Sequence, residues 1–220
     1  MSMTLKLKRI SVTALAAIGF AIAGQAHAAP QVCGTPGCPA INMLTPGAEY
    51  GSLFTLGFKF SVPNNALATS LGVYDSGRDG LSGAAQVAIW DTAGQQLISA
   101  TIPSGTGGEL DGFFRYVSIP SFSLLAGTQY IIGAHTTSQA SSLFTGEGGS
   151  GSVDPNLTLI RDAFSTSGFS FPNQTNGYIG AWLGANFRMT APIPEPETYQ
   201  MLALGLLAIT AVALRRRKPA

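Results

Sequence analysis

Two aspartates, Asp75 and Asp79, stand four residues apart in a polar turn that ends at Gly80. Hard cations such as Ca²⁺ bind clustered carboxylate and carbonyl oxygens. The turn does not match an EF-hand loop, because Gly77 occupies the third position and Gln86 the twelfth, where a glutamate is required. Two interpretations remain open. Asp75 and Asp79 bind calcium together with other oxygen ligands, or they shape a turn through the backbone geometry that Asp and Gly favour.

The residue types needed for catalysis do not form a recognisable constellation. His135 stands alone at the end of a predicted strand, and the other histidine, His27, lies in the leader segment. A zinc site needs more ligands, and a Ser-His-Asp triad needs an activated serine on a recognisable turn. A glycosidase needs two carboxylates about 5–9.5 Å apart, and the sequence brings no two of its candidates together in a cleft: Asp75, Asp79, Asp91, Glu109 and Asp111. We therefore expect a protein that is not an enzyme, with a glycan hydrolase as the least favoured alternative.

Aromatic side chains offer a second kind of chemistry, which is stacking on sugar rings. Most aromatics in strands belong to the core, because each ring buries a large area, and we expect this of Trp90. Tyr178 and Trp182 stand instead in a glycine-rich stretch near a loop. These two residues are the candidates for glycan contact if they are exposed.

Both cysteines, Cys33 and Cys38, enclose the short sequence Gly-Thr-Pro-Gly near the start of the mature chain. Four intervening residues are too many for a Cys-x-x-Cys redox motif, and zinc would need further ligands. In an oxidising compartment the pair is typical of a local structural disulfide. Free thiols are the alternative.

The composition of residues 29–191 differs from that of the whole chain. This body carries five Lys and Arg against nine Asp and Glu, a net charge of −4, whereas the whole chain is formally +1. The positive charge therefore lies in the two ends. A mildly acidic body without a basic patch argues against a nucleic-acid partner.

The body shows the alternation of β-strands, with apolar and β-branched residues at every second position and turn residues between the runs. No stretch of the body has a helical period. Strands are predicted at 53–62, 66–74, 86–91, 96–102, 113–119, 129–135, 157–160, 178–183 and 185–189. Eight or nine short strands with frequent turns predict an all-β fold, an antiparallel sandwich similar to a jelly roll.

The N-terminal residues 1–28 have the features of a secretory signal peptide. Lys6, Lys8 and Arg9 precede an apolar stretch. Ala26 and Ala28 fit the small-residue rule for signal peptidase cleavage, which would leave Ala29 as the new N-terminus. A signal anchor that is never cut is the alternative.

The C-terminal residues 192–220 contain three parts in order. A Pro194-Glu195-Pro196 box comes first, an uncharged apolar run at 199–214 follows, and Arg215, Arg216 and Arg217 close the segment. As a helix, the run covers roughly 24 Å, which is short against a hydrocarbon core of about 30 Å. Long cationic side chains extend the reach, and their position favours a cytoplasmic C-terminus. We expect a short transmembrane helix in the inner membrane.

This three-part tail resembles the PEP-CTERM sorting signal of Gram-negative bacteria. The resemblance implies cleavage near the box by an exosortase, so the chain would be a substrate of that enzyme. Residues 53–189 resemble an uncharacterised β-sandwich module of exported bacterial proteins, through motifs such as Leu71-Gly-Val-Tyr-Asp75 and Val87-Ala-Ile-Trp90. That resemblance implies the fold and carries no functional residue.

The sequence therefore predicts a signal peptide (1–28), a cysteine-containing segment (29–52), a sandwich (53–191) and a sorting tail (192–220). The expected function is that of a non-enzymatic protein delivered to the cell surface or to the extracellular polysaccharide matrix. A lectin-like carbohydrate-binding module, dependent on calcium in one version, is the alternative. No cofactor is predicted apart from that calcium.

Overall fold

The computed structural model describes residues 37–51, 53–136, 142–144, 149–190 and 206. Within these residues the chain forms fourteen strands and one 3₁₀ turn, η1 (Ser76–Arg78). The strands are β1 (Cys38–Pro39), β2 (Ile41–Thr45), β3 (Glu49–Gly51), β4 (Thr55–Ser61), β5 (Ala66–Tyr74), β6 (Ala85–Asp91), β7 (Gln96–Ile102), β8 (Glu109–Asp111), β9 (Phe114–Leu124), β10 (Gln129–Thr136), β11 (Ser142–Phe144), β12 (Ser150–Val153), β13 (Thr158–Ser165) and β14 (Ala185–Thr190).

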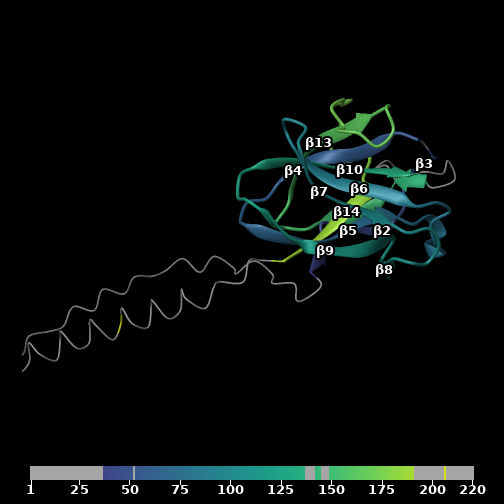
Figure 1. Ribbon diagram of the computed structural model, residues 1–220, viewed down its shortest axis with the longest axis horizontal. Coiled ribbons are helices and arrows are strands. Elements are labelled where there is room, and N and C mark those ends of the chain that lie inside the picture. Colours follow the sequence, from purple (N-terminus) through teal and green to yellow (C-terminus); the bar gives the residue numbers. More distant parts are fainter. Residues whose placement is uncertain (1–36, 52, 137–141, 145–148, 191–205, 207–220) are drawn as a thin grey trace, which may run out of the picture.

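Two five-stranded antiparallel sheets pack face to face (Figure 1). The first sheet has the order β1-β14-β5-β9-β8, and the second has the order β13-β4-β10-β6-β7. Within them, the runs β1-β14-β5-β9 and β4-β10-β6-β7 have the order of the two four-stranded sheets of a jelly roll. The predicted all-β antiparallel sandwich is confirmed. The short pairs β11-β3 and β12-β2 add to it.

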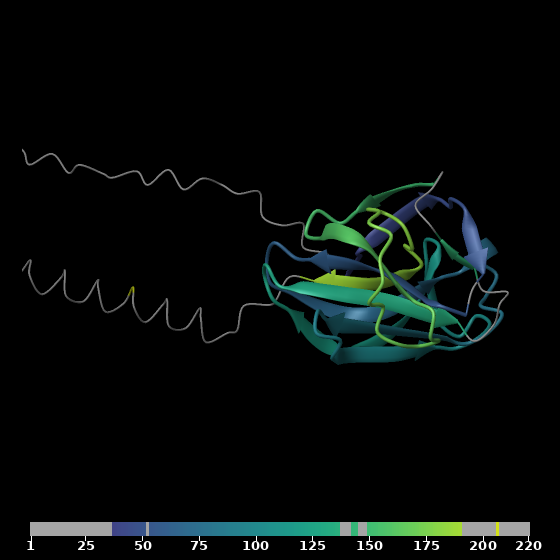
Figure 2. The ribbon, with the colours of Figure 1, turned by 90° about the horizontal axis from the view of Figure 1, so that it is seen from above.

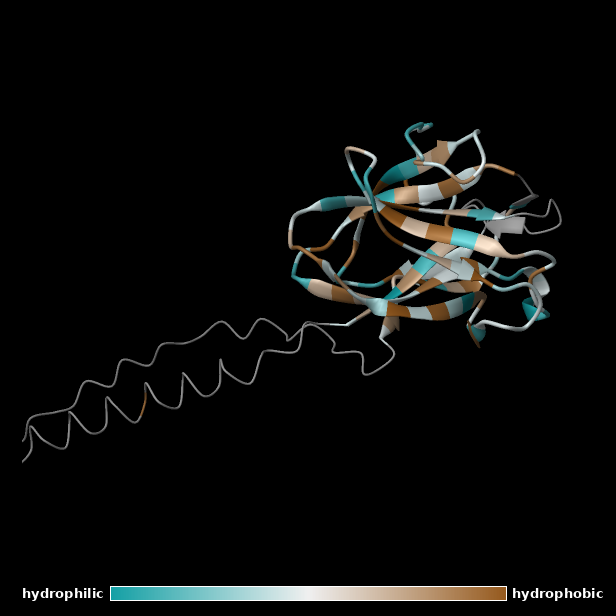
Figure 3. Cartoon of the chain, in the orientation of Figure 1, coloured by the Kyte–Doolittle hydropathy of each residue, from teal (hydrophilic) through white to brown (hydrophobic). Residues whose placement is uncertain are grey.

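The core between the sheets follows from the two-residue period of the strands. Alternate residues of β4, Leu56, Phe58 and Phe60, are at most 2% exposed and point toward the first sheet. The Phe60 ring lies 5.0 Å from that of Phe187 on β14, which joins the two layers. Figure 3 shows the corresponding alternation of apolar and polar residues along the strands.

The outer face of the second sheet is also covered. The connection between β13 and β14, residues 166–184, passes over it, as Figure 2 shows in yellow-green. Thr55 fixes this strap, because its Oγ1 donates to the Gly168 carbonyl at 2.5 Å and accepts from the Ser170 amide at 3.1 Å. Beneath the strap, Trp90 is 3% exposed and its ring lies 5.7 Å from that of Phe169. Trp90 is thus buried, but on the far side of the sheet from the main core.

The outer face of the first sheet is covered by the N-terminal strands. The Asn186 side chain accepts from the Ile41 amide at 3.1 Å and donates to the Ile41 carbonyl at 2.8 Å, which holds β2 across β14. β1 itself pairs with β14, so Cys38 lies opposite Met189. Residues 38–51 therefore belong to the sandwich. The predicted sandwich, which begins at residue 53, leaves these residues out, because β1 and β3 have only two and three residues and show no period.

Two strand predictions hold to the residue, because β5 and β7 have the predicted bounds, whereas the strand expected at 178–183 is wrong. There the backbone turns through positive φ at Gly180 (84°) and Trp182 (57°), which an extended strand does not allow.

Several predicted features fall outside the described residues: the signal peptide, Cys33 of the expected disulfide, the Pro-Glu-Pro box and, Leu206 aside, the apolar run at 199–214. In the part of the chain that the structure describes, no helix is both long and apolar enough to cross a membrane. The disulfide and the transmembrane helix stay predictions.

The strap requires a glycine at position 133 of β10. A Cβ there would lie 2.8 Å from Thr55 Cγ2, 3.2 Å from Pro172 Cγ and 3.3 Å from the Trp90 ring. We expect Gly133→Ala to lower the free energy of unfolding by about 1–3 kcal/mol through overpacking and to shift Trp90 fluorescence to the red. Thr101→Ala is the control, because Thr101 is exposed on β7 and does not lie beneath the strap. Unchanged fluorescence in the Gly133 variant would contradict this account of the strap.

Candidate functional site

The strap presents two apolar side chains to solvent at the edge of the second sheet. Tyr178 is 66% exposed and Ile179 is 72% exposed. The preceding residues, 173–177, are exposed as well and consist of amide, hydroxyl and glycine residues. Together, residues 173–179 form a loop, which we call the Tyr178 loop, whose composition of Tyr, Asn, Gln, Thr and Gly resembles that of binding loops.

Asp162 on β13 anchors this loop. Its buried carboxylate accepts four hydrogen bonds, from Thr175 Oγ1 (2.7 Å) and from the amides of Asn176 (2.9 Å), Gly177 (2.9 Å) and Tyr178 (3.0 Å). Burial by itself would raise the pKa of this carboxyl, but the hydrogen bonds outweigh burial and lower the pKa below its usual value of 3.8. The loop is therefore held in one conformation around a fixed negative charge.

The backbone of the same loop covers the free edge of β13. The Asp162 amide donates to the Tyr178 carbonyl at 2.7 Å, and Phe164 and Gln174 exchange two backbone hydrogen bonds at 2.9 and 3.0 Å. Gly177 allows the turn between these contacts, because its φ is 84°. An exposed aromatic on so constrained a backbone loses little freedom when it binds, which favours affinity.

Of the two aromatics predicted to stack on glycans, the structure exposes one. Trp182 is half-buried and packs against the main core, because the chain turns inward after Gly180 to begin β14. Trp182, a candidate for glycan contact if exposed, is therefore not presented to solvent in the way that Tyr178 is. Ile179, which the sequence analysis did not single out, is its exposed neighbour.

The turn that suggested calcium is held by an internal ion pair. Asp75 is 1% exposed, and its Oδ2 lies 2.6 Å from Nε of Arg115, which is also buried. Both carboxylate oxygens of Asp75 also accept from the Gly80 amide at 3.2 Å. Asp79, in contrast, is exposed. Asp75 anchors the turn, and the described residues contain no group of three or more His, Cys, Asp or Glu arranged to hold a metal.

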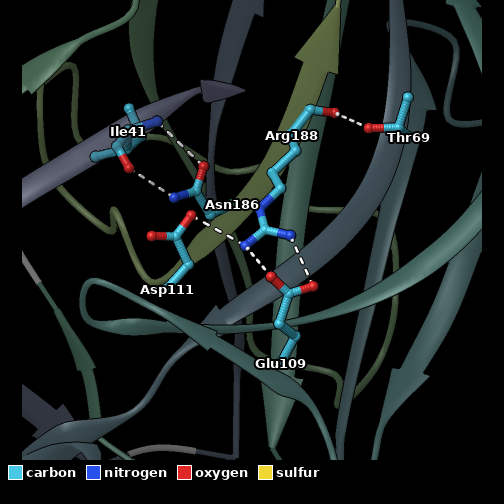
Figure 4. A network of polar contacts seen from close by, with 6 residues as sticks. All are labelled: Ile41, Thr69, Glu109, Asp111, Asn186 and Arg188. Atoms are coloured by element: carbon cyan, nitrogen blue, oxygen red, sulfur yellow. Dashed lines mark hydrogen bonds and ion pairs between the residues drawn. The ribbon is translucent and has the colours of Figure 1, made fainter. Parts of the chain in front are cut away.

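A second ion-pair network lies on the outer face of the first sheet (Figure 4). Arg188 on β14 donates to both carboxylate oxygens of Glu109, at 3.0 and 2.9 Å, and to Asp111 at 3.0 Å. Its guanidinium lies 4.3 Å from the centre of the Tyr116 ring. Gly72 makes room for this ring, because a Cβ there would lie 2.5 Å from Tyr116 Cδ1.

The network is asymmetric in exposure. The Arg188 side chain is 2% exposed, whereas those of Glu109 and Asp111 are 62% and 47% exposed. The hydrogen bond from Arg188 is the main cause that lowers the pKa of Glu109. Burial would lower the pKa of Arg188, but the bonds to Glu109 and Asp111 raise it. This arrangement ties β8 to the sheet and consumes two of the carboxylates that a hydrolase would need.

His135, the other catalytic candidate, lies at the edge of the strap. Its Nδ1 is 3.4 Å from the Phe54 carbonyl oxygen, and its ring lies 6.5 Å from that of Phe169. Neither contact partner is a nucleophile or an acid. The described structure therefore does not bring His135 together with the carboxylates named above.

Comparison with models of known protein families identifies the family of this sandwich. The model of a domain of unknown function, DUF4082, matches residues 44–183, which is more than half of the chain. The chain belongs to the DUF4082 family. The sandwich extends beyond the matched residues at both ends. β1 lies before residue 44 and β14 lies after residue 183, and the two strands pair with each other in the first sheet. A search of curated proteins finds no match.

A second family model, the PEP-CTERM protein-sorting motif, matches residues 192–218. This confirms the tail that the sequence predicted, with Pro194, Glu195, Pro196 and Arg215–Arg217 inside the match. This DUF4082 protein is thus an exported protein with a signal for processing by exosortase, directed to the cell envelope or surface.

The anchor of the Tyr178 loop can be tested by Asp162→Asn. The amide side chain loses the charge and one acceptor group, so buried amides lose partners, and we expect a loss of about 2–4 kcal/mol in the free energy of unfolding. Because the folded pKa is lowered, this stabilisation is present above pH 3.8 and is lost as the pH falls through the folded pKa. Hydrogen exchange at Asn176, Gly177 and Tyr178 should accelerate. Asp154→Asn, which affects a single local bond to the Asn156 amide, should leave exchange at the Tyr178 loop unchanged.

The Arg188 network predicts unequal costs for its two sides. Glu109→Gln with Asp111→Asn leaves a buried cation without a counter-charge, and we expect it to cost about 3–5 kcal/mol. Arg188→Met leaves two exposed carboxylates that water solvates, and should cost only about 1–3 kcal/mol. Urea unfolding of the two variants gives the comparison. If the two variants lost equal stability, or if Arg188→Met lost more, the unpaired charge of Arg188 would not be the main cause of the destabilisation.

Proposed function

We propose that this DUF4082 protein is a non-enzymatic component of the cell surface or the extracellular polysaccharide matrix. The observation that carries the proposal is the PEP-CTERM motif directly after the last strand of the sandwich. Signal peptidase would remove the leader, and the tail would hold the chain in the inner membrane until exosortase cleaves it. The sandwich would then act by contact with neighbouring polymers.

The use of the carboxylates supports action by contact. Asp75 pairs with Arg115, Glu109 and Asp111 pair with Arg188, and Asp162 holds the Tyr178 loop. Asp91 accepts from the amides of its own turn, at Ala93 and Gln95, and Glu49 accepts from the side chains of Tyr74 and Ser76. Carboxylates with such internal partners stabilise the fold, and this role favours a structural protein over a hydrolase. Hydrolysis of any polysaccharide by the purified protein, lost on substitution of one of these carboxylates, would overturn the proposal.

Carbohydrate binding is the second candidate function, and the Tyr178 loop is the observation that favours it. A tyrosine that is 66% exposed on an anchored backbone offers a rigid apolar ring with a polar tip, surrounded by amide side chains that donate and accept hydrogen bonds. The Tyr178 loop contains no carboxylate side chain that would bind calcium. The carbohydrate-binding version of the proposal therefore expects binding that EDTA leaves unchanged.

Processing can be tested by replacing Pro194, Glu195 and Pro196 with alanine in a host that carries exosortase. We expect a full-length tail retained in the membrane fraction, whereas the parent protein should begin near Ala29, lack the tail and lie outside the cell. Intact mass and cell fractionation measure both. Thr198→Ala, just beyond the box, is the control. Normal release of the triple variant would count against sorting through this box.

A further inference from the structure

Two of the five cations of the body lie directly opposite each other on the second sheet. Arg161 on β13 is the register partner of Lys59 on β4, so both side chains project from the same face. Arg161 is exposed and Lys59 is half-buried. Like charges directly opposite each other in a sheet are destabilising. The body nevertheless places them together although its net charge is −4.

The other three cations of the body are engaged within the fold. Arg115 pairs with Asp75, Arg188 pairs with Glu109 and Asp111, and Arg78 lies over the Phe113 ring at 5.5 Å. Among the described residues, Lys59 and Arg161 have no ion pair, hydrogen bond or ring contact of their side chains. The pair is therefore a concentrated positive charge without an internal counter-ion in the described structure.

The surroundings do not supply that counter-ion. Lys59 continues a row on the outer face of the sheet with Ile131 and Trp90, which are apolar and buried. The strands of this sheet contain two acids, Asp91 and Asp162, and both accept hydrogen bonds from amides of nearby turns. Residues 163–187, which include the strap, carry no charged side chain. An anion bound on this face would neutralise Lys59 and Arg161.

We propose that Lys59, Arg161 and the Tyr178 loop form a binding site for an acidic polysaccharide with carboxylate groups. Arg161 directly precedes Asp162, whose carboxylate and amide hold Tyr178, so the cation pair and the exposed ring lie at the same edge of the sheet. The two cations bind the carboxylates of successive sugars, and the ring and amides of the loop contact the sugar body. This inference rests on the proposed contact with polysaccharide and names its chemical class.

The choice of ligand follows from combining two features. A phosphate-rich polymer would satisfy the cations but would leave the Tyr178 ring and its amides unused. A neutral glycan would use the ring but would leave the paired cations in mutual repulsion. A polymer that carries both a charge and an apolar sugar face on each unit uses both, and each contact strengthens the other because the loop is already ordered.

The test compares three polymers binding to the full chain in a neutral detergent: polygalacturonate, dextran and inorganic polyphosphate. We expect binding to polygalacturonate that weakens as salt increases, with dextran and polyphosphate much weaker. Lys59→Gln and Arg161→Gln should each weaken binding about two- to fivefold. The double variant should bind more weakly than either, but not by the product of the two effects, because the two side chains interact directly. Tyr178→Ser should weaken binding without changing its salt dependence.

Arg78→Gln is the matched control, because it removes the same charge from an exposed turn at the far sheet. Equal weakening in this control would show non-specific attraction and overturn the site. Tight binding of polyphosphate, equal binding of dextran, or no binding of polygalacturonate would overturn it as well. These binding experiments can fail without affecting the proposed function. The proposed function is tested separately, by measuring the release and location of the processed protein in cells.

The like-charge pair also has a signature in stability. At low ionic strength, Lys59→Gln should raise the melting temperature by about 1–3 °C, because it removes the repulsion with Arg161. The gain should shrink at high salt, and polygalacturonate should raise the melting temperature of the parent protein more than that of the variant. If Lys59→Gln lowered the melting temperature, Lys59 would stabilise the fold, and the proposed role of Lys59 in ligand binding would be overturned.

Discussion

The outer face of each sheet is partly covered by other segments of the chain, and the polar groups beneath these coverings must find partners inside the fold. A simple two-layer sandwich leaves its outer faces to water. Here the N-terminal strands cross the first sheet and the strap crosses the second. Where the coverings meet the sheets, single polar side chains join them: Asn186 holds the backbone of Ile41, Thr55 holds the strap, and Asp162 holds the Tyr178 loop. Without these partners, each covering would bury unpaired amides and carbonyls.

The same constraint explains why buried charged side chains stand in largely apolar strands. Asp162 and Arg188 interrupt the strands that begin at Thr158 and Ala185. A buried charge needs ion-pair or hydrogen-bond partners. Asp162 finds them in the Tyr178 loop, and Arg188 finds them in Glu109 and Asp111. The proposed contact surface follows from this. The loop that Asp162 satisfies is the one that exposes Tyr178, so the requirement of the fold and the presentation of a contact residue have one cause.

The sequence was sufficient for the sandwich because strands such as β4 place apolar residues at every second position, at Leu56, Phe58 and Phe60, and because the turns contain Gly, Pro and Asn. It was insufficient for β1, β8 and β11, which have two or three residues each and therefore no period to read. It also failed at 178–183, where aromatic and β-branched residues favour a strand but the local backbone turns. Tyr178 could be named from composition, whereas Lys59 and Arg161 could not be paired, since their opposition depends on a register with a bulge between Leu159 and Arg161. A charged residue in a largely apolar strand, as at position 162 or 188, is the signal that sequence reading could have used.

The position of the sorting motif fits this architecture. β14 lies between β1 and β5 in the first sheet and ends at Thr190, and the motif begins at residue 192. A cut anywhere within the motif therefore removes none of the described strands and none of the contacts that hold Arg188 or Asn186. The pairing of Cys38 with Met189 closes the sheet just before the tail begins. The sorting signal and the proposed contact surface are thus separated along the chain, so a cut in the tail leaves the Tyr178 loop and the cation pair in the body.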